Sequence, residues 1–189
     1  MEAVNIEDLR QLARKRLPKV LFDFIDGGSY DEVTLRANVA DLNRIRFRPK
    51  VLVDVSQRSL ETTLFGRKLT VPIILAPVCS AGVFARCGEE AAARAAQRCD
   101  TTLCLYTASI CSIEEIAAQR QTPYMFQLYM GQDRDHARDL VERAQAAGCF
   151  ALALTVDTVV GVSATRMFAT ATWSRPGSCH AMSSTRCCM

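Results

Sequence analysis

Polar side chains stand at the ends of four apolar stretches of this sequence, where their amide, hydroxyl and carboxyl groups could hold a ligand. The chemistry open to them is hydrogen bonding, because glutamine, threonine and tyrosine each offer both a donor and an acceptor. Each of them could equally be a structural residue whose partners are other protein groups. The four groups are Pro77-Val78-Cys79, in which the thiol is the one polar side chain, Tyr106-Thr107, Gln127 with Tyr129, and Thr155 with Asp157.

The stretches that carry these groups alternate with helical stretches. Continuous apolar runs are expected of strands buried on both faces of a parallel sheet. Strands that alternate with helices predict successive βα units. Ser112 and Glu115 have the spacing of a capping box, which supports one of the helices. The expected strands are 71–78, 102–109, 124–130 and 150–158, and the expected helices are 88–99, 112–120 and 133–148.

The first expected strand, 71–78, lacks a nucleotide-binding fingerprint. Neither GxGxxG nor GxxxxGK[ST] follows it, which disfavours a Rossmann or P-loop domain. A βα barrel is the better prediction, and in such a barrel the binding groups gather at the carboxyl ends of the strands. The four polar groups would then meet on one rim. A generic phosphate-binding barrel of unrelated chemistry also fits the strand pattern.

The residues before this alternation have a different pattern. Asn5 is typical of a helix N-cap, and Pro18 separates a first helix from a second at 19–26. A third helix is expected across 31–43, and short β segments are expected at 51–56 and 62–71. The predicted organisation is a helical N-terminal extension with a β-hairpin region in 1–70, the first four βα units of a barrel in 71–161, and a tail in 162–189.

Charge and hydropathy exclude several classes of protein. The net charge is +3 and the basic residues are scattered, which argues against a nucleic-acid partner. The basic run at 44–50 is read as a solvated connection rather than an anion site. The N-terminus is acidic and polar, unlike a signal peptide, and the apolar runs are too short to span a bilayer. We therefore expect a cytoplasmic protein.

The nine cysteines do not predict a metal site. There is no CxxC pair, and the spacing of the cysteines and the histidine near the C-terminus, 179–188, is not that of a zinc site. The other six are expected to be reduced, small buried residues. These six are Cys79, Cys87, Cys99, Cys104, Cys111 and Cys149.

A family resemblance appears once these stretches are taken in order. DFIDGG, RIRFRPKVLVDVS, TTLFG, VPIILAPV, GEEAAARAA, SIEEIA, FQLYM and ALTVDT follow one another across residues 3–161. Together they resemble the N-terminal half of the FMN-dependent α-hydroxy-acid dehydrogenases and oxidases, which include bacterial L-lactate dehydrogenase, mandelate dehydrogenase and glycolate oxidase. The resemblance implies an α/β fold, the N-terminal half of a (β/α)8 TIM barrel with a helical N-terminal extension, and FMN across the barrel mouth.

The resemblance also assigns roles to the strand-end residues. Pro77, Val78 and Cys79 match positions whose backbone contacts the flavin ring. Gln127 matches the glutamine that hydrogen-bonds the pyrimidine edge of the flavin, and Thr155 matches another flavin hydrogen-bonding position. Tyr129 matches the tyrosine that contacts the substrate near the reacting carbon.

Two positions depart from the family pattern. Phe24 stands where a tyrosine hydroxyl helps to hold the substrate carboxylate. Tyr106 stands where a serine lies next to the flavin, and the larger side chain would crowd the cofactor.

The segment after ALTVDT departs from the family altogether. The family continues with a segment like GxRxRDxRNGF, whereas this chain continues with GVSATRMFATATW. Suitable codons for that stretch, read in another frame, spell a family-like segment that ends in RNGYM. We therefore interpret 162–189 as out-of-frame translation after a single-nucleotide deletion near Gly161.

The predicted function follows from the resemblance. It implies oxidation of a small L-2-hydroxy acid, L-lactate-like, to the 2-oxo acid, with electrons passed to a respiratory-chain acceptor at the inner membrane, where the protein would be peripheral. The family's base histidine and carboxylate-binding arginine have no counterpart here, so no catalytic residue is assigned and the chain as written is expected to be inactive. The alternative is a non-catalytic half-barrel remnant or interaction fragment that pairs with itself.

Overall fold

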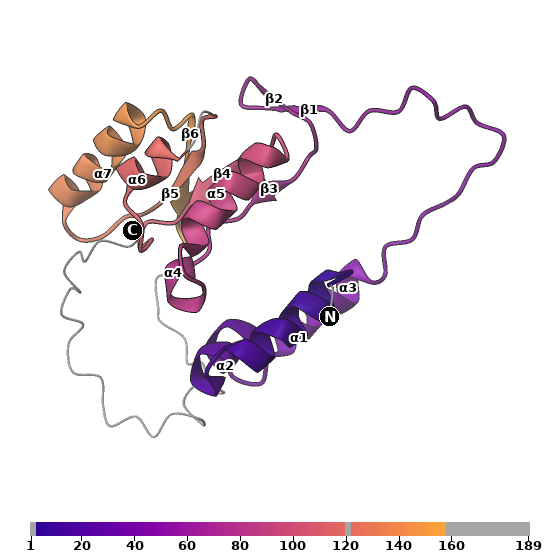
Figure 1. Ribbon diagram of the computed structural model, residues 1–189, viewed down its shortest axis with the longest axis horizontal. Coiled ribbons are helices and arrows are strands. Elements are labelled where there is room, and N and C mark those ends of the chain that lie inside the picture. The colour runs from indigo at the N-terminus through magenta and orange to yellow at the C-terminus, as the bar shows by residue number, and fades with distance from the viewer. Residues whose placement is uncertain (1–2, 120–121, 158–189) are drawn as a thin grey trace. The chain divides into compact units, whose positions relative to one another are not determined.

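The computed structural model describes residues 3–119 and 122–157, and their helices and strands can be followed in Figure 1. The contacts divide them into two compact units, one of residues 3–53 and one of residues 54–157. None of the helices in these ranges is long and apolar enough to cross a membrane.

The unit of residues 3–53 contains three helices, as expected. The Asn5 side chain accepts a hydrogen bond from the Asp8 backbone N–H at 2.9 Å, so the predicted N-cap is confirmed. Arg10 of the first helix donates from Nη2 to Asp26 of the second at 2.9 Å. The helices are α1 (Ile6–Arg16), α2 (Lys19–Asp26) and α3 (Val33–Leu42).

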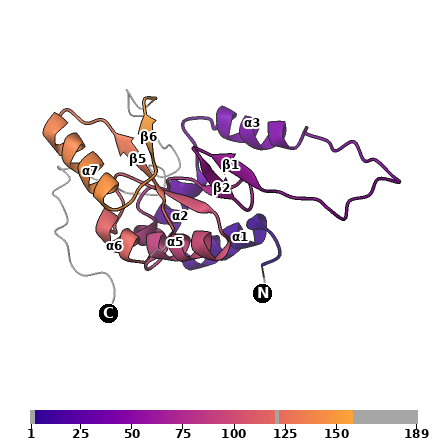
Figure 2. The same cartoon turned by 90° about the horizontal axis from the view of Figure 1, so that it is seen from above.

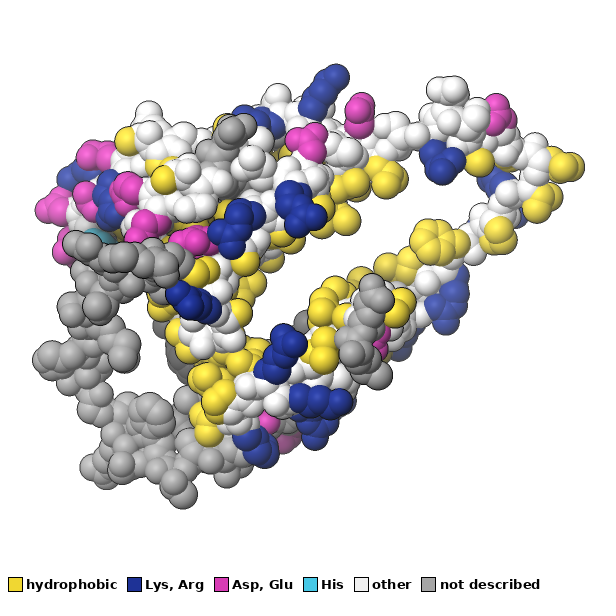
Figure 3. All heavy atoms as spheres, viewed as in Figure 1, with side chains coloured by type: hydrophobic (Ala, Val, Ile, Leu, Met, Phe, Trp, Pro, Cys, Tyr) yellow, Lys and Arg dark blue, Asp and Glu magenta, His cyan; other side chains and the backbone are white. Residues whose placement is uncertain are grey.

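An extended segment, residues 44–61, follows α3. It contains no helix or strand, so the strand expected at 51–56 is wrong. Its apolar side chains are exposed, with Phe47 at 96% and Val51 at 82%, and hydrophobic side chains can be seen along it in Figure 3. β-branched residues favour a strand only where a neighbouring strand and a packed face are available. The structure describes neither for this segment.

A parallel sheet of four strands organises the second unit. The strands lie in chain order, β3-β4-β5-β6, and a helix precedes each of the last three. The predicted alternation of strands and helices is confirmed, and the short helix α4 (Ala81–Phe84) was not expected. The strands are β3 (Ile74–Leu75), β4 (Thr102–Leu105), β5 (Met125–Tyr129) and β6 (Ala151–Thr155), and the helices before the last three are α5 (Gly88–Arg98), α6 (Ile113–Ala118) and α7 (Arg134–Ala146).

Local signals explain where these helices begin and end. The predicted capping box is present, because the Ser112 hydroxyl accepts from the Glu115 N–H at 3.1 Å and the Glu115 carboxylate accepts from the Ser112 N–H at 2.7 Å. Beyond the end of α7, Gly148 has a φ of +79°, a value that glycine adopts without strain.

The hydrophobic core lies between the sheet and these helices. Phe126 and Leu128 of β5 are each 1% exposed and pack with Ile116 of α6 and Leu140 of α7, and Figure 2 shows α7 beside β5. Because side chains alternate along a strand, Gln127 and its neighbours two residues away point to the opposite face of the sheet. That face is the one on which the predicted site residues would lie.

A β-hairpin lies at the amino ends of the strands, away from the predicted site. Its strands are β1 (Thr62–Leu64) and β2 (Arg67–Leu69), paired antiparallel. The Thr70 hydroxyl hydrogen-bonds Asp100 at 2.6 Å, just before β4. The Arg67 guanidinium lies 5.2 Å from the centre of the Phe150 ring, just before β6.

An ion pair joins α6 to α7, and we expect its contribution to stability to depend on pH. Arg143 donates two hydrogen bonds of 2.8 Å to the Glu114 carboxylate, which lowers the pKa of Glu114 from 4.5 to about 2. Because the pKa is depressed in the folded state, the stabilisation is present above about pH 4.5 and is lost as the pH falls toward 2. We expect Glu114→Gln to lower the free energy of unfolding by about 0.5 kcal/mol at pH 7, since both side chains are partly exposed.

Urea unfolding at pH 7 and at pH 3.5 measures this difference, which should shrink at the lower pH and in high salt. Glu142→Gln, at an exposed position of α7, is the matched control and should show a smaller change. A difference that grows as the pH falls would contradict the assignment.

Candidate functional site

Gln127 is the buried polar residue at the centre of the candidate site. It lies in β5 and is 3% exposed. Its side-chain Nε2 donates to the Thr155 hydroxyl of β6 at 2.7 Å. Its Oε1 accepts from the Thr107 backbone N–H at 3.1 Å. Two of the predicted flavin-binding residues, Gln127 and Thr155, are therefore in direct contact.

Thr107 connects the end of β4 to two residues of β5. Its hydroxyl donates to the Gln127 backbone carbonyl and accepts from the Tyr129 backbone N–H at 3.0 Å. The sequence placed Thr107 at a strand end but gave it no role. A hydroxyl residue immediately after an apolar strand is the only signal that points to it.

Two tyrosines meet beside this network. The Tyr106 and Tyr129 rings are 5.6 Å apart between centres and cross at 85°, an edge-to-face contact. Burial, together with hydrogen bonding to Cys79, raises the pKa of the Tyr106 hydroxyl well above its usual range. Tyr106 thus contacts two predicted site residues, Cys79 of the loop after β3 and Tyr129 of β5.

The loop after β3 is accessible to solvent. Pro77, Val78 and Cys79 are exposed, with Val78 at 58%. The Ser80 hydroxyl, one residue further on, donates to the Ala108 carbonyl at 3.0 Å and so connects this loop to the loop after β4. An exposed loop here is what a close approach by a planar ring would require.

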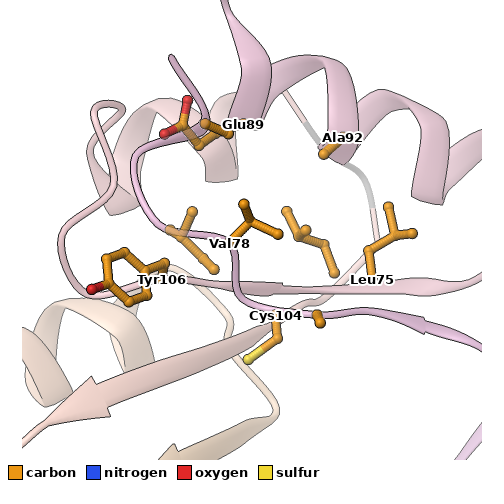
Figure 4. Close-up of a pocket in the computed structure, with 10 residues that line it drawn as sticks. Leu75, Val78, Glu89, Ala92, Cys104 and Tyr106 are labelled. Carbon is orange, nitrogen blue, oxygen red and sulfur yellow. The ribbon is translucent and has the colours of Figure 1, made fainter. Parts of the chain in front are cut away.

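A cavity of about 250 Å³ lies between α5 and the strands β3 and β4. Figure 4 shows Ala92 of α5 and Leu75 among the residues that line it. Val78 and Tyr106 also line it, whereas Gln127, Tyr129 and Thr155 do not. The cavity therefore adjoins the strand-end residues but is separate from the Gln127–Thr155 contact.

Glu89, in the first turn of α5, fixes the loop after β4. Its carboxylate is 4% exposed and accepts from the Ile110 backbone N–H at 3.1 Å. This bond ties the segment that carries Tyr106 and Thr107 to α5.

Phe24 belongs to the other unit. It lies in α2 and is 43% exposed. The structure describes this unit separately from the strand-end residues, so the predicted role of Phe24 beside the substrate stays a prediction.

The described cysteines form no metal site, and no cluster of three or more possible metal ligands occurs in residues 3–119 and 122–157. Five of the six cysteines are free thiols, as expected. Cys79 and Cys99 are exposed rather than buried, because they lie on connections and not in the core.

The histidine of the described residues and the predicted strand-end residue Asp157 lie outside this hydrogen-bond network. His136 lies in the first turn of α7, where its backbone N–H donates to the Asp133 side chain at 3.0 Å. Asp157 is exposed just beyond β6. The predicted out-of-frame segment, 162–189, lies outside the described residues.

Ser109 has a buried hydroxyl with no hydrogen-bond partner among the described residues. A buried polar group without a partner costs about 1–3 kcal/mol. We therefore expect Ser109→Ala to raise the free energy of unfolding by about 1 kcal/mol in urea titration. Ser80→Ala, which removes a serine hydroxyl that has a partner, is the matched control and should lower it. A loss of stability in Ser109→Ala would show that the hydroxyl is satisfied.

Comparison with known proteins agrees with this geometry. The sequence profile of the family described as FMN-dependent dehydrogenase matches residues 13–184. The L-lactate dehydrogenase of Pseudomonas syringae pv. syringae (strain B728a) is 51% identical over 153 residues, which cover 81% of this chain and 40% of the relative. That of Caulobacter sp. (strain K31) is 51% identical over 150 residues, 79% of this chain and 40% of the relative. The chain thus spans about two fifths of these relatives.

A solved structure is similar in fold as well as in sequence. It is a soluble mutant of the membrane-associated (S)-mandelate dehydrogenase from Pseudomonas putida, with a TM-score of 0.81 and 38% identity, over 85% of this chain and 46% of that one. The likeness, together with the parallel order of β3 to β6, confirms the expected half-barrel.

Proposed function

This chain belongs to the FMN-dependent dehydrogenase family, and on that basis we propose that its strand-end residues form the flavin-facing part of an enzyme that oxidises an L-2-hydroxy acid to the 2-oxo acid. The observation that carries the proposal is the hydrogen bond of 2.7 Å between Gln127 and Thr155 at the carboxyl ends of neighbouring strands. Ligands bind at this end of the strands in βα barrels.

The polar groups present fit the pyrimidine edge of a flavin. An amide side chain has two N–H donors and two acceptor lone pairs. Gln127 uses one donor on Thr155 and one lone pair on Thr107. One donor and one lone pair remain, which is the pair of groups that an alternating donor and acceptor edge needs.

The other site residues would contact the flavin ring and the substrate. The backbone of residues 77–79 would lie against the flavin ring, because these residues are exposed and come before the helix α4 begins. Tyr129 would contact the substrate beside the reacting carbon, and Phe24 would lie near the substrate carboxylate without the hydroxyl that binds it. FMN, when bound, supplies the two-electron redox chemistry, while the protein supplies binding and orientation.

L-Lactate is the proposed substrate. The two L-lactate dehydrogenases are 51% identical to this chain, whereas the mandelate dehydrogenase is 38% identical. The methyl group of lactate also demands less space than the phenyl ring of mandelate, and Tyr106 narrows the region beside Tyr129.

The 189-residue chain alone is proposed not to turn over its substrate. A general base must come within hydrogen-bond reach of the proton it removes. His136, the one histidine in the described residues, lies in the first turn of a helix on the far side of the core from Gln127. Turnover would require further groups of the kind that the rest of the longer relatives supplies.

The electron acceptor is proposed to be a component of the respiratory chain, reached by peripheral association with the inner membrane. The membrane-associated mandelate dehydrogenase supports this assignment.

A second candidate function is that of an interaction fragment that pairs with itself. Leu152 and Leu154 of β6 are 47% and 50% exposed, whereas their register partners Phe126 and Leu128 are covered. Exposed apolar strand faces favour association. Light scattering on the purified chain should then give a mass above that of one chain, and a monomer at all concentrations would contradict it.

Complementation tests the main proposal. The purified chain is mixed with the part of the P. syringae L-lactate dehydrogenase that lies beyond its match to this chain, and reduction of an artificial electron acceptor is followed with L-lactate, D-lactate and mandelate. We expect FMN-dependent activity with L-lactate only in the mixture. Activity of either part alone, or a preference for mandelate, would contradict the proposal as stated.

A further inference from the structure

Thr107 makes three hydrogen bonds to two candidate site residues. Its backbone N–H donates to Gln127 Oε1 at 3.1 Å. Its hydroxyl donates to the Gln127 backbone carbonyl and accepts from the Tyr129 backbone N–H at 3.0 Å. One residue thus holds both the side chain and the backbone of the glutamine at the centre of the site.

These bonds lie where the β4–β5 ladder has ended. β4 pairs with β5 only as far as Leu105 opposite Phe126, whereas β5 pairs with β6 as far as Tyr129 opposite Thr155. Beyond Leu105 the Thr107 side chain takes the place of a strand, because its hydroxyl serves the carbonyl and the N–H that a ladder would have paired. The end of β5 is therefore hydrogen-bonded along both edges, to β6 on one and to Thr107 on the other.

The bonds also fix which way the Gln127 amide faces. A backbone N–H can only donate, so the atom of Gln127 that faces Thr107 must be the oxygen. The amide nitrogen is then directed to the Thr155 hydroxyl, 2.7 Å away. With the opposite orientation two donors would face each other at Thr107.

The loop that carries Thr107 is itself held in place. Tyr106 and Ser109 close a turn through a backbone hydrogen bond of 3.2 Å. The Ser80 hydroxyl binds the Ala108 carbonyl within that turn at 3.0 Å. The Thr107 N–H is therefore aimed at Gln127 by the loops after both β3 and β4.

We propose that Thr107 is a positioning residue whose hydroxyl holds the end of β5 so that the Gln127 amide meets the Thr107 N–H in one orientation, and that it thereby sets the donor and acceptor presented to the flavin. The link to flavin rests on the proposed function, whereas the orientation of Gln127 does not. Valine has the shape of threonine but lacks both hydroxyl bonds, and serine retains them. The proposal therefore predicts different results for these two substitutions.

The first arm of the test uses the full chain without FMN. Nuclear magnetic resonance of the ¹⁵N-labelled protein follows hydrogen exchange of the Gln127 side-chain amide, identified by its loss in Gln127→Leu, and of the Tyr129 backbone amide. In Thr107→Val we expect both to exchange at least tenfold faster than in the wild type. Thr107→Ser should stay within twofold, and Thr63→Val, at an exposed hairpin position, should change neither.

The second arm measures FMN binding by fluorescence quenching and the absorption band of the bound flavin. We expect Thr107→Val to weaken binding about tenfold and to shift the band, and Thr107→Ser to restore both. If the wild type binds no FMN but the first arm behaves as expected, the positioning role stands and the proposed function falls.

Unchanged exchange in Thr107→Val would overturn the positioning role whatever the FMN result. If that variant does not fold, hydrogen exchange in the wild type and in Thr107→Ser decides. Tyr129 amide exchange as fast as that of an unstructured peptide would mean that the Thr107 hydroxyl does not accept its bond, and the proposal would fail. Slow exchange that is retained in Thr107→Ser would support it.

Discussion

Replacing Gln127 by leucine should abolish the polar contact at the ends of β5 and β6 and weaken FMN binding at least tenfold. The Thr107 N–H and the Thr155 hydroxyl would both lose their partner in a site where the side chain is 3% exposed. Each buried group left without a partner costs about 1–3 kcal/mol. We therefore expect the free energy of unfolding to fall by about 2–3 kcal/mol, measured by urea titration beside the FMN titration.

Gln132→Leu is the matched control for this prediction. Gln132 is an exposed glutamine in the loop after β5, so the same substitution there should change neither stability nor FMN binding. Equal affinities for FMN in Gln127→Leu and the wild type would mean that Gln127 is a structural residue only.

Replacing Tyr106 by serine should strengthen FMN binding about tenfold. The family resemblance places a serine beside the flavin at this position, and overpacking a filled site costs about 1–3 kcal/mol. Here the Tyr106 ring packs edge-on against Tyr129 and its hydroxyl meets Cys79. Removing the ring opens the space beside Tyr129, and fluorescence quenching on titration with FMN measures the gain.

Tyr30→Ser controls for the loss of a tyrosine elsewhere, because Tyr30 is 64% exposed in the other unit. It should leave the FMN affinity unchanged. If Tyr106→Ser weakened binding instead, Tyr106 would be a ring-stacking partner of the ligand rather than an obstacle to it.

Much of the barrel unit could be predicted from the sequence because its signals are local. An apolar run predicts a buried strand. A polar residue inside such a run indicates which face and which end of the strand that residue occupies. Gln127 and Thr155 were predicted in this way, and they are hydrogen-bonded to each other. The capping box of α6 could also be predicted from the sequence, because both of its residues lie within one turn.

Features that depend on distant partners were not predicted correctly. The segment 51–56 has the β-branched composition of a strand but no neighbouring strand in the described residues. The role of Thr107 depends on where the ladder between β4 and β5 ends, two residues before it, and the sequence does not reveal that point. The exposure of Cys79 likewise depends on the course of the loop after β3, which composition does not reveal.

A crystal structure of this chain with FMN at saturating concentration tests the central claim most directly. We predict that the pyrimidine edge of the flavin lies within about 2.7–3.2 Å of the Gln127 amide or the Thr155 hydroxyl, with its ring over the backbone of residues 77–79. Flavin bound instead in the cavity between α5 and β3, with Gln127 and Thr155 in contact only with each other, would contradict it.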